Sequence, residues 1–169
     1  MTIAERYAEF LISHGITHAF GIVGSANLSI FEALARRITV VSTHHEQAAA
    51  IAAAYFYRVS GRLAPCLVTA GAGAMNALTG VQEAYMDSVP LLVISGNEQS
   101  RFFGAPHNRS IGFQGFEVAE VVRTFTKYAK RVDGMDALSE LEAGFKRALT
   151  PRQGPVWIDV PQDIARSGT

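Results

Sequence analysis

Three short runs of the chain are apolar almost throughout, without alternation between apolar and polar residues. A strand with one face in solvent alternates, whereas a continuous apolar run is covered on both faces, as in a parallel sheet. Three further runs also read as strands, and helical segments separate all six. The predicted strands are residues 18–21, 39–43, 65–69, 90–95, 128–132 and 156–160. The pattern predicts an α/β fold, a doubly wound six-stranded parallel sheet with helices on both faces and right-handed crossovers, in a single domain.

Capping residues and glycines mark the predicted helices between these strands. Thr2 and Glu5 form a capping box for the first helix, which stops at Gly15. Asn27 is expected to cap the second helix, which runs through Arg37. The later predicted helices are residues 47–60, a helix that follows a turn at 71–76 and runs to 86, and residues 116–125 and 136–149. Residues 96–115, which include His107, fit no regular pattern, and a connection of this length is typical of a functional segment.

Composition narrows the class of protein. The chain has 169 residues, enough for one domain with a proper core. Its 15 basic and 15 acidic residues give a net charge of zero, which argues against nucleic-acid and membrane partners. Cys66 is the single cysteine, so we expect a core residue and no intrachain disulfide. With no membrane-span or signal-peptide pattern, we expect a cytoplasmic protein.

Ligands of doubly wound sheets bind beyond the carboxyl ends of the strands, and four of these ends are rich in glycine or polar residues. They are residues 21–25, 43–47, 70–76 and the segment from 96 onward. Gly71, Gly73 and Asn76 partly match a dinucleotide fingerprint, but asparagine replaces the third glycine, so a nucleotide binder is a weak alternative. His44 and His45 are adjacent and would face opposite ways on a strand. We therefore predict no metal site in this chain.

Glu46 lies between the strand that ends near 43 and a helix whose first turns, residues 48–54, are mostly alanine. Burial at this junction favours the protonated carboxyl, whereas the positive end of the helix dipole favours the carboxylate. Taken alone, this segment fits an ordinary first-turn acid that complements the helix dipole.

Several motifs together resemble one family. The motifs are residues 45–50, 68–76, 84–90, 94–96, 112–114 and 154–161. They resemble the N-terminal, pyrimidine-binding domain of thiamin-diphosphate enzymes of the acetolactate synthase group, which also includes decarboxylases, lyases and sulfoacetaldehyde acetyltransferase. The resemblance spans nearly the whole chain, so residues 1–169 are interpreted as one such domain.

The resemblance implies a role for each matching residue. A glutamate at the place of Glu46 hydrogen-bonds N1′ of the cofactor's aminopyrimidine and so helps to activate the thiazolium C2 for attack on a 2-oxo acid. The residues implied to lie against the cofactor are Gly21, Gly24, Glu46, Ala70, Gly71, Gly73 and Asn76. Ser25 and Gln114 are implied to face the substrate. Ser25 could equally be a simple turn residue, and Asn76 a helix cap.

Departures from the family pattern leave the substrate open. Val23 stands where many members have proline, and Gly115 where an acid usually follows the glutamine. The turn at 20–26 looks most like sulfoacetaldehyde acetyltransferase, whereas residues 45–50 look more like acetolactate synthase. Decarboxylation and carboligation of a small 2-oxo acid both fit.

The family's middle and diphosphate-binding domains have no counterpart in these 169 residues. The resemblance therefore implies a split enzyme in which a partner subunit binds the diphosphate and Mg²⁺ of a shared thiamin diphosphate, in a homo- or hetero-oligomer. The helix at 48–54 and the helix after Gly73 are the expected partner face. The alternatives are an excised N-terminal domain of a longer enzyme and a non-catalytic module of the same fold.

Overall fold

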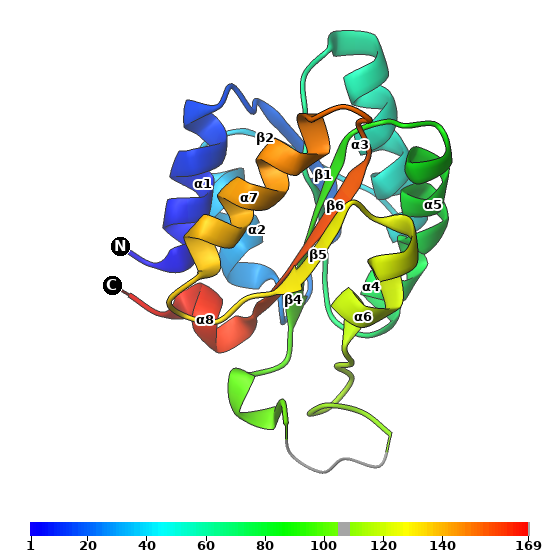
Figure 1. The fold of residues 1–169 in the computed structure, drawn as a ribbon. Coiled ribbons are helices and arrows are strands. Elements are labelled where there is room, and N and C mark those ends of the chain that lie inside the picture. The colour runs from blue at the N-terminus through cyan, green and yellow to red at the C-terminus, as the bar shows by residue number, and fades with distance from the viewer. Residues whose placement is uncertain (105–108, 169) are drawn as a thin grey trace.

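The computed structural model describes residues 1–104 and 109–168, so His107 lies outside the described residues. The centre of the fold is a six-stranded, all-parallel sheet with the order β2-β1-β3-β4-β6-β5 (Figure 1). The strands are β1 (His18–Gly21), β2 (Thr39–Ser42), β3 (Cys66–Val68), β4 (Leu91–Asn97), β5 (Tyr128–Arg131) and β6 (Pro155–Pro161). This arrangement confirms the predicted α/β class, the six strands and the parallel sheet.

Helices cover both faces of the sheet (Figure 1). One face carries α1 (Ile3–Ser13), α2 (Leu28–Ala35), α7 (Ala137–Leu149) and α8 (Gln162–Arg166). The other carries α3 (Glu46–Ser60), α4 (Ala72–Asn76), α5 (Leu78–Met86) and α6 (Val118–Val122). Within the described residues, no helix combines the length and apolar character needed to cross a membrane.

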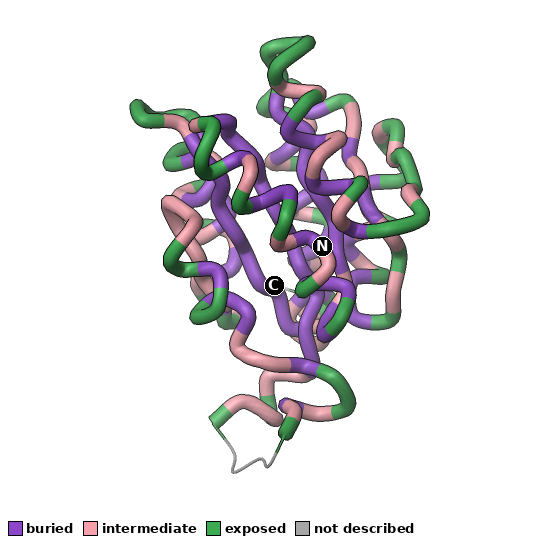
Figure 2. Tube along the Cα trace, turned by 90° about the vertical axis from the view of Figure 1, so that its right-hand side faces the viewer, coloured by how far each residue is buried: buried purple, intermediate pink, exposed green. Residues whose placement is uncertain are grey.

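The core consists of two apolar clusters, one on each side of the sheet. Strands β3, β4 and β6 are buried along their whole length, as the continuous apolar runs predicted (Figure 2). Successive residues of these strands enter opposite clusters: Leu67 and Ile158 face α1 and α7, whereas Cys66 and Trp157 face α3 and α5. Cys66 is therefore a core residue as expected, and burial, with a smaller effect of Glu46, raises the pKa of its thiol.

Several local predictions are confirmed and others are wrong. The capping box is present: the Thr2 N–H donates to Glu5 Oε2 at 2.8 Å, and the Glu5 N–H donates to Thr2 Oγ1 at 3.2 Å. Asn27 does not cap α2 with its side chain. Its amide instead closes the preceding turn, because Oδ1 accepts from the Gly24 N–H at 2.7 Å and Nδ2 donates to the Ile22 carbonyl at 3.0 Å.

Some helix boundaries also differ from the prediction. Residues 72–76, expected as a turn, form α4, and the predicted helix at 116–125 is α6 followed by a 3₁₀ turn at Arg123–Phe125. Helix α8 and the 3₁₀ turn Ser100–Phe102 were not predicted. These short segments are stabilised by contacts between distant parts of the chain, such as the Ser100 N–H donating to Asp163 Oδ1 at 2.8 Å, which local patterns do not show.

Candidate active site

Glu46 lies at the carboxyl edge of the sheet, the lower edge in Figure 1, as the first residue of α3. His45 precedes it as the N-cap and accepts a hydrogen bond from the Gln47 N–H through Nδ1 at 3.2 Å. Thr43 supports this turn by donating its hydroxyl to the His45 carbonyl at 2.9 Å. Glu46 itself is only 8% exposed. The chain thus places one carboxyl group in a largely dry position at a helix N-terminus.

Asn76 binds this carboxyl group directly. Its Nδ2 donates to Glu46 Oε2 at 2.9 Å, across 30 residues of sequence. Asn76 is the last residue of α4, and its side chain caps no helix, so the capping alternative is wrong. Glu46 Oε1 accepts no hydrogen bond from any other described residue. One carboxyl oxygen is therefore held by Asn76, and the other has no hydrogen-bond partner among the described residues.

Three glycines of the predicted site let the strand-end turns approach each other. A Cβ on Gly24 would lie 2.5 Å from Thr69 Cβ, and one on Gly73 would lie 2.7 Å from Thr69 Cγ2 and 3.2 Å from Glu46 Oε1. Gly71 has φ +67°, and its Cβ would lie 2.7 Å from the Gln114 carbonyl oxygen. The closest neighbours of all three belong to the chain itself. Whether the backbone of these turns also contacts a ligand stays a prediction.

The remaining predicted residues divide into two groups. Gln114 lies against the Gly71 turn through its carbonyl oxygen and the first carbons of its side chain, and Ala70 is buried beside that turn. Gly21 packs on Leu67 within the sheet, where a Cβ would lie 2.3 Å from the Leu67 carbonyl oxygen. Ser25 is exposed, and no hydrogen bond joins its side chain to another described residue. The structure therefore links Gly24, Gly71, Gly73, Asn76 and Gln114 to the surroundings of Glu46, but it does not link Ser25.

Two residues were missed by sequence reasoning. Thr69 lies between the Gly24 and Gly73 turns, and its Oγ1 is buried without a hydrogen-bond partner in the described part of the chain. Glu98 is 5% exposed and accepts a hydrogen bond from the Gln114 N–H through Oε1 at 3.3 Å. A Cβ on Gly115 would lie 2.6 Å from Glu98 Cγ, which explains why a larger residue is absent there. Both are polar residues beside the end of an apolar strand. This position is the sequence signal that could have identified them as candidate site residues.

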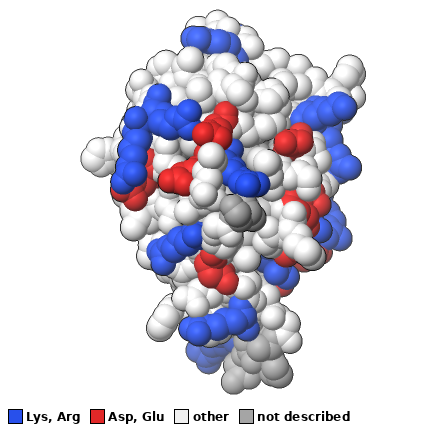
Figure 3. All heavy atoms as spheres, turned by 90° about the vertical axis from the view of Figure 1, so that its left-hand side faces the viewer, with Lys and Arg blue, Asp and Glu red and all other residues white. Residues whose placement is uncertain are grey.

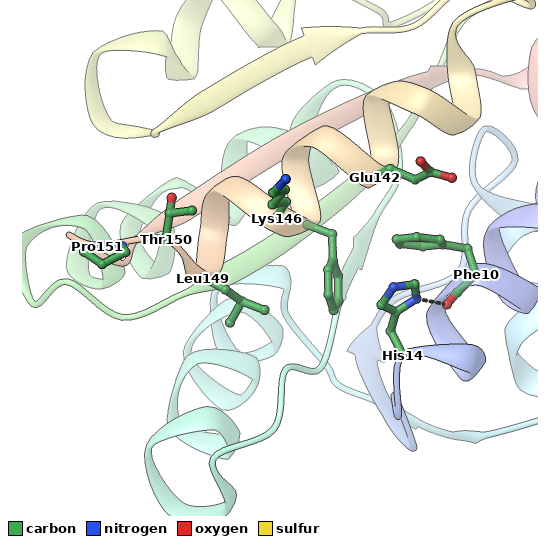
Figure 4. Close-up of a pocket in the computed structure, with 8 residues that line it drawn as sticks. Phe10, His14, Glu142, Lys146, Leu149, Thr150 and Pro151 are labelled. Carbon is green, nitrogen blue, oxygen red and sulfur yellow. Dashed lines mark hydrogen bonds between the residues drawn. The ribbon is translucent and has the colours of Figure 1, made fainter.

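Other surfaces lack the features of this edge. Within residues 1–104 and 109–168, no group of three or more His, Cys, Asp or Glu side chains could hold a metal ion. A groove of about 680 Å³ lies between α1 and α7, on the other face of the molecule from α3 (Figure 4). Phe10 and His14 face it from α1, and no predicted site residue lines it (Figure 4). On the face shown in Figure 3, basic and acidic side chains are interspersed.

A doubly wound parallel sheet with a buried acid and glycine turns at its carboxyl edge defines a class of ligand-binding α/β domains. Within this class, the chain matches the family model "Thiamine pyrophosphate enzyme, N-terminal TPP binding domain" over residues 1–144. The chain therefore belongs to this family.

Several relatives are acetolactate synthases. The chain is 38% identical over 168 residues to the acetolactate synthase large subunit of Buchnera aphidicola subsp. Schizaphis graminum, covering 96% of this chain and 28% of the relative. It is 37% identical over 164 residues to acetolactate synthase 2, chloroplastic, of Brassica napus, covering 95% and 25%. It is 37% identical to acetolactate synthase isozyme 3 large subunit of Escherichia coli, covering 95% and 28%. The chain thus spans about a quarter of the length of these relatives.

Proposed function

We propose that this chain is the pyrimidine-binding part of a thiamin-diphosphate-dependent enzyme that decarboxylates a small 2-oxo acid or joins it to an acceptor. The observation that carries the proposal is the buried Glu46 carboxyl, with Oε2 fixed by Asn76 and Oε1 free of described partners. Family membership and the acetolactate synthase relatives support the same reading.

The Glu46 carboxyl group, held by the Asn76 amide, fits an aminopyrimidine ring. A carboxyl group with little exposure can share a proton with a weakly basic ring nitrogen, because water competes poorly for that proton. Asn76 orients the carboxyl by binding Oε2, so that Oε1 is the oxygen that exchanges the proton. When bound, thiamin diphosphate supplies the nucleophilic carbon and the electron sink for cleavage beside a 2-oxo group. Gln114, which contacts the Gly71 turn, is the residue of this chain we assign to the substrate side.

The outer surfaces of α3, α4 and α5 carry exposed apolar side chains, which is the evidence for a partner domain. Large apolar side chains there are well exposed: Tyr55 45%, Val59 88%, Met75 45%, Tyr85 39% and Met86 64%. We call these five residues the apolar face. Exposed apolar side chains gathered on adjacent helices are typical of an interaction surface. We propose that a diphosphate-binding domain, which also holds Mg²⁺, covers this face.

Two arrangements supply such a domain. In a split enzyme it is a separate subunit, in a hetero-oligomer. In a longer enzyme it is a later part of the same polypeptide, as the quarter-length match to the relatives allows. A non-catalytic module of the same fold is the remaining alternative. Native mass spectrometry of the untagged protein from its own cells separates these cases. A co-purifying polypeptide with thiamin diphosphate and magnesium identifies the split enzyme, whereas a lone chain without cofactor contradicts it.

Replacing Glu46 by glutamine tests the catalytic role. Glutamine keeps the size of the side chain but cannot exchange a proton, so E46Q in the assembled enzyme should lower kcat by about 10²–10⁴-fold, the contribution typical of a general acid–base residue. Steady-state turnover of 2-oxo acids measures the effect, and native mass spectrometry checks that assembly is intact. Glu9→Gln, an exposed residue of α1 on the other face, is the matched control. Unchanged turnover in E46Q would exclude the proposed role.

A further inference from the structure

Asp159 is a fully buried acid that the proposed chemistry does not use. It lies near the end of β6 with 0% exposure, in a strand that is otherwise apolar. Ser95 Oγ donates to Asp159 Oδ1 at 2.5 Å, and Asn97 Nδ2 donates to Asp159 Oδ2 at 2.7 Å. Trp157 Nε1 donates to the same Ser95 oxygen at 2.7 Å. A buried carboxylate with both oxygens bonded strongly constrains the groups that donate to it.

Asn97 connects Asp159 to both ends of the connection between β4 and α6. We call residues 97–104 the first stem and residues 109–116 the second stem of this connection. Asn97 Oδ1 accepts from the Glu98 N–H at 2.9 Å, at the start of the first stem. Asn97 Nδ2 also donates to the Phe116 carbonyl at 3.0 Å, at the end of the second stem. One amide, oriented by Asp159, thus bonds both stems.

Contacts of the second stem link Asp159 to the candidate active site. Ile111 and Gly115 bond each other in both directions, each N–H to the other's carbonyl at 2.8 Å. Glu98 of the first stem accepts from the Gln114 N–H, and the Gln114 carbonyl packs against Gly71. Gly71 belongs to the same turn as Gly73, which lies beside Glu46 Oε1. A continuous series of contacts therefore runs from Asp159 to the surroundings of Glu46.

We propose that Asp159 is a positioning residue, which, through Asn97, sets the place of both stems and so of Gln114 relative to Glu46. Its consequence for a substrate rests on the proposed function, but its effect on the stems does not. The charged groups that act on Asp159 are Arg131 of β5, which is its neighbour in the sheet, and Glu117, which pairs with Arg131 before α6. Asp163 of α8 bonds Ser100 separately and so contacts the first stem alone.

Hydrogen exchange of the purified chain tests the proposal without cofactor or partner. Asp159→Val fills a similar volume but accepts no hydrogen bond, so amides of both stems should exchange about tenfold faster or more, while β4 residues 91–94 stay protected. Asp159→Asn keeps an oxygen that can accept from Asn97 and should retain most of the protection. Equal exchange in wild type and D159V would overturn the proposal. A uniform rise that includes α1 would also overturn it, because that rise reports global destabilisation.

Two more variants separate the arms of the network. Trp157 is the single tryptophan, so its emission reports on the Ser95 arm. Ser95→Ala should shift this emission and leave stem exchange unchanged, because the bond from Asn97 to Asp159 remains. Asn97→Ala should raise stem exchange with little change in emission, and it gives the same test if D159V fails to fold. Stem protection that survives N97A would contradict the proposal, whether or not the chain binds thiamin diphosphate.

Discussion

At the scale of single residues, the hydroxyl and methyl groups of Thr69 make opposing contributions to stability. Its Oγ1 is buried between the Gly24 and Gly73 turns without a described partner, and an unpaired buried hydroxyl costs about 1–3 kcal/mol. Its methyl group, by contrast, packs against the position where Gly73 lacks a Cβ. Shape at this position therefore contributes to stability, whereas we expect the hydroxyl to oppose it.

Threonine-to-valine substitution at position 69 keeps the shape and removes the hydroxyl. We expect T69V to leave the free energy of unfolding unchanged or to raise it by up to about 2 kcal/mol. Thr126→Val is the matched control, because Thr126 Oγ1 donates to the Val122 carbonyl at 2.9 Å, so its loss should cost about 1 kcal/mol. Urea unfolding of both variants gives the comparison. A clear destabilisation by T69V would mean that the hydroxyl has a partner.

Asp159 makes a second residue-scale prediction, about pH. Burial raises the pKa of its carboxyl to about 7, against the opposing effect of hydrogen bonds from Ser95 and Asn97. The folded chain then binds a proton that the unfolded chain releases near pH 4, so stability falls as pH rises from about 4 to 7. We expect wild type to lose on the order of 2–4 kcal/mol relative to D159N between pH 4 and 8.

Urea unfolding of wild type and D159N across this pH range measures the difference. Asp163→Asn is the control with the opposite sign. Although burial opposes the shift, hydrogen bonds from Ser100 lower the pKa of Asp163, so its contribution to stability is lost only as pH falls below about 4. D163N should therefore leave the slope between pH 5 and 8 unchanged. A flat difference between wild type and D159N would contradict a raised pKa.

At the scale of elements, helices α3 and α5 pack closely against each other. A Cβ on Gly80 of α5 would lie 2.7 Å from Ala50 Cβ and 2.9 Å from the Ile51 backbone nitrogen. The alanines of α3 supply the complementary small surface, since Ala49, Ala50 and Ala53 are buried against this cluster. The alanine-rich run after Glu46 therefore positions α5, and with it α4, beside the sheet.

Gly80→Ala tests this packing against helix propensity. Alanine is favoured over glycine inside a helix by about 1 kcal/mol. The atoms of α3 that face Gly80 are a Cβ and backbone atoms, however, and these cannot move aside for an added methyl group as a flexible side chain can. We expect G80A to lower the free energy of unfolding by about 1–3 kcal/mol in urea unfolding. Gly144→Ala in α7 is the helical control, because its Cβ would meet the flexible end of Ile158 at 2.9 Å. A more stable G80A would show that the two helices can separate without loss.

Elements with local signals were predictable from the sequence. The capping box of Thr2, the left-handed Gly61 that ends α3, and the continuous apolar strands each follow from neighbouring residues. The position of Glu46 at a strand–helix junction was predictable for the same reason. The roles of Asn27 and Asp159 were not. Asn27 bonds Gly24 and Ile22, which are close in the sequence, but the sequence does not show whether its side chain bonds the turn before it or the helix after it. The partners of Asp159 come from tertiary contacts. Asp159 bonds Ser95 and Asn97 across more than 60 positions, and an isolated polar residue in an apolar strand gives no sign of them.

At the scale of the whole molecule, the two ends of the sheet and its two faces have separate roles. The candidate active site lies at the carboxyl edge, the apolar face lies outside α3, α4 and α5, and the groove lined by Phe10 and Phe145 lies between α1 and α7. Glu46 begins the same helix that carries Tyr55 and Val59. A partner that covers α3 along its whole length would therefore reach the candidate active site at the first turn of the helix, which is where the rest of a cofactor must be bound.

Lysine substitution on the apolar face tests this arrangement in the assembled enzyme. Met86→Lys places a charge where we expect apolar contact, so it should weaken association by tenfold or more, since burying an unpaired charge costs several kcal/mol. Met135→Lys is the matched control, because Met135 is 97% exposed in the turn before α7, away from this face. Both variants should have a free energy of unfolding within about 0.5 kcal/mol of wild type, as is usual for substitutions at exposed positions.

Where the partner domain is covalently attached, the same loss of association appears as independent unfolding of the two domains in calorimetry. Equal association of M86K and M135K would place the partner on another surface, and the groove between α1 and α7 would then be the next surface to test.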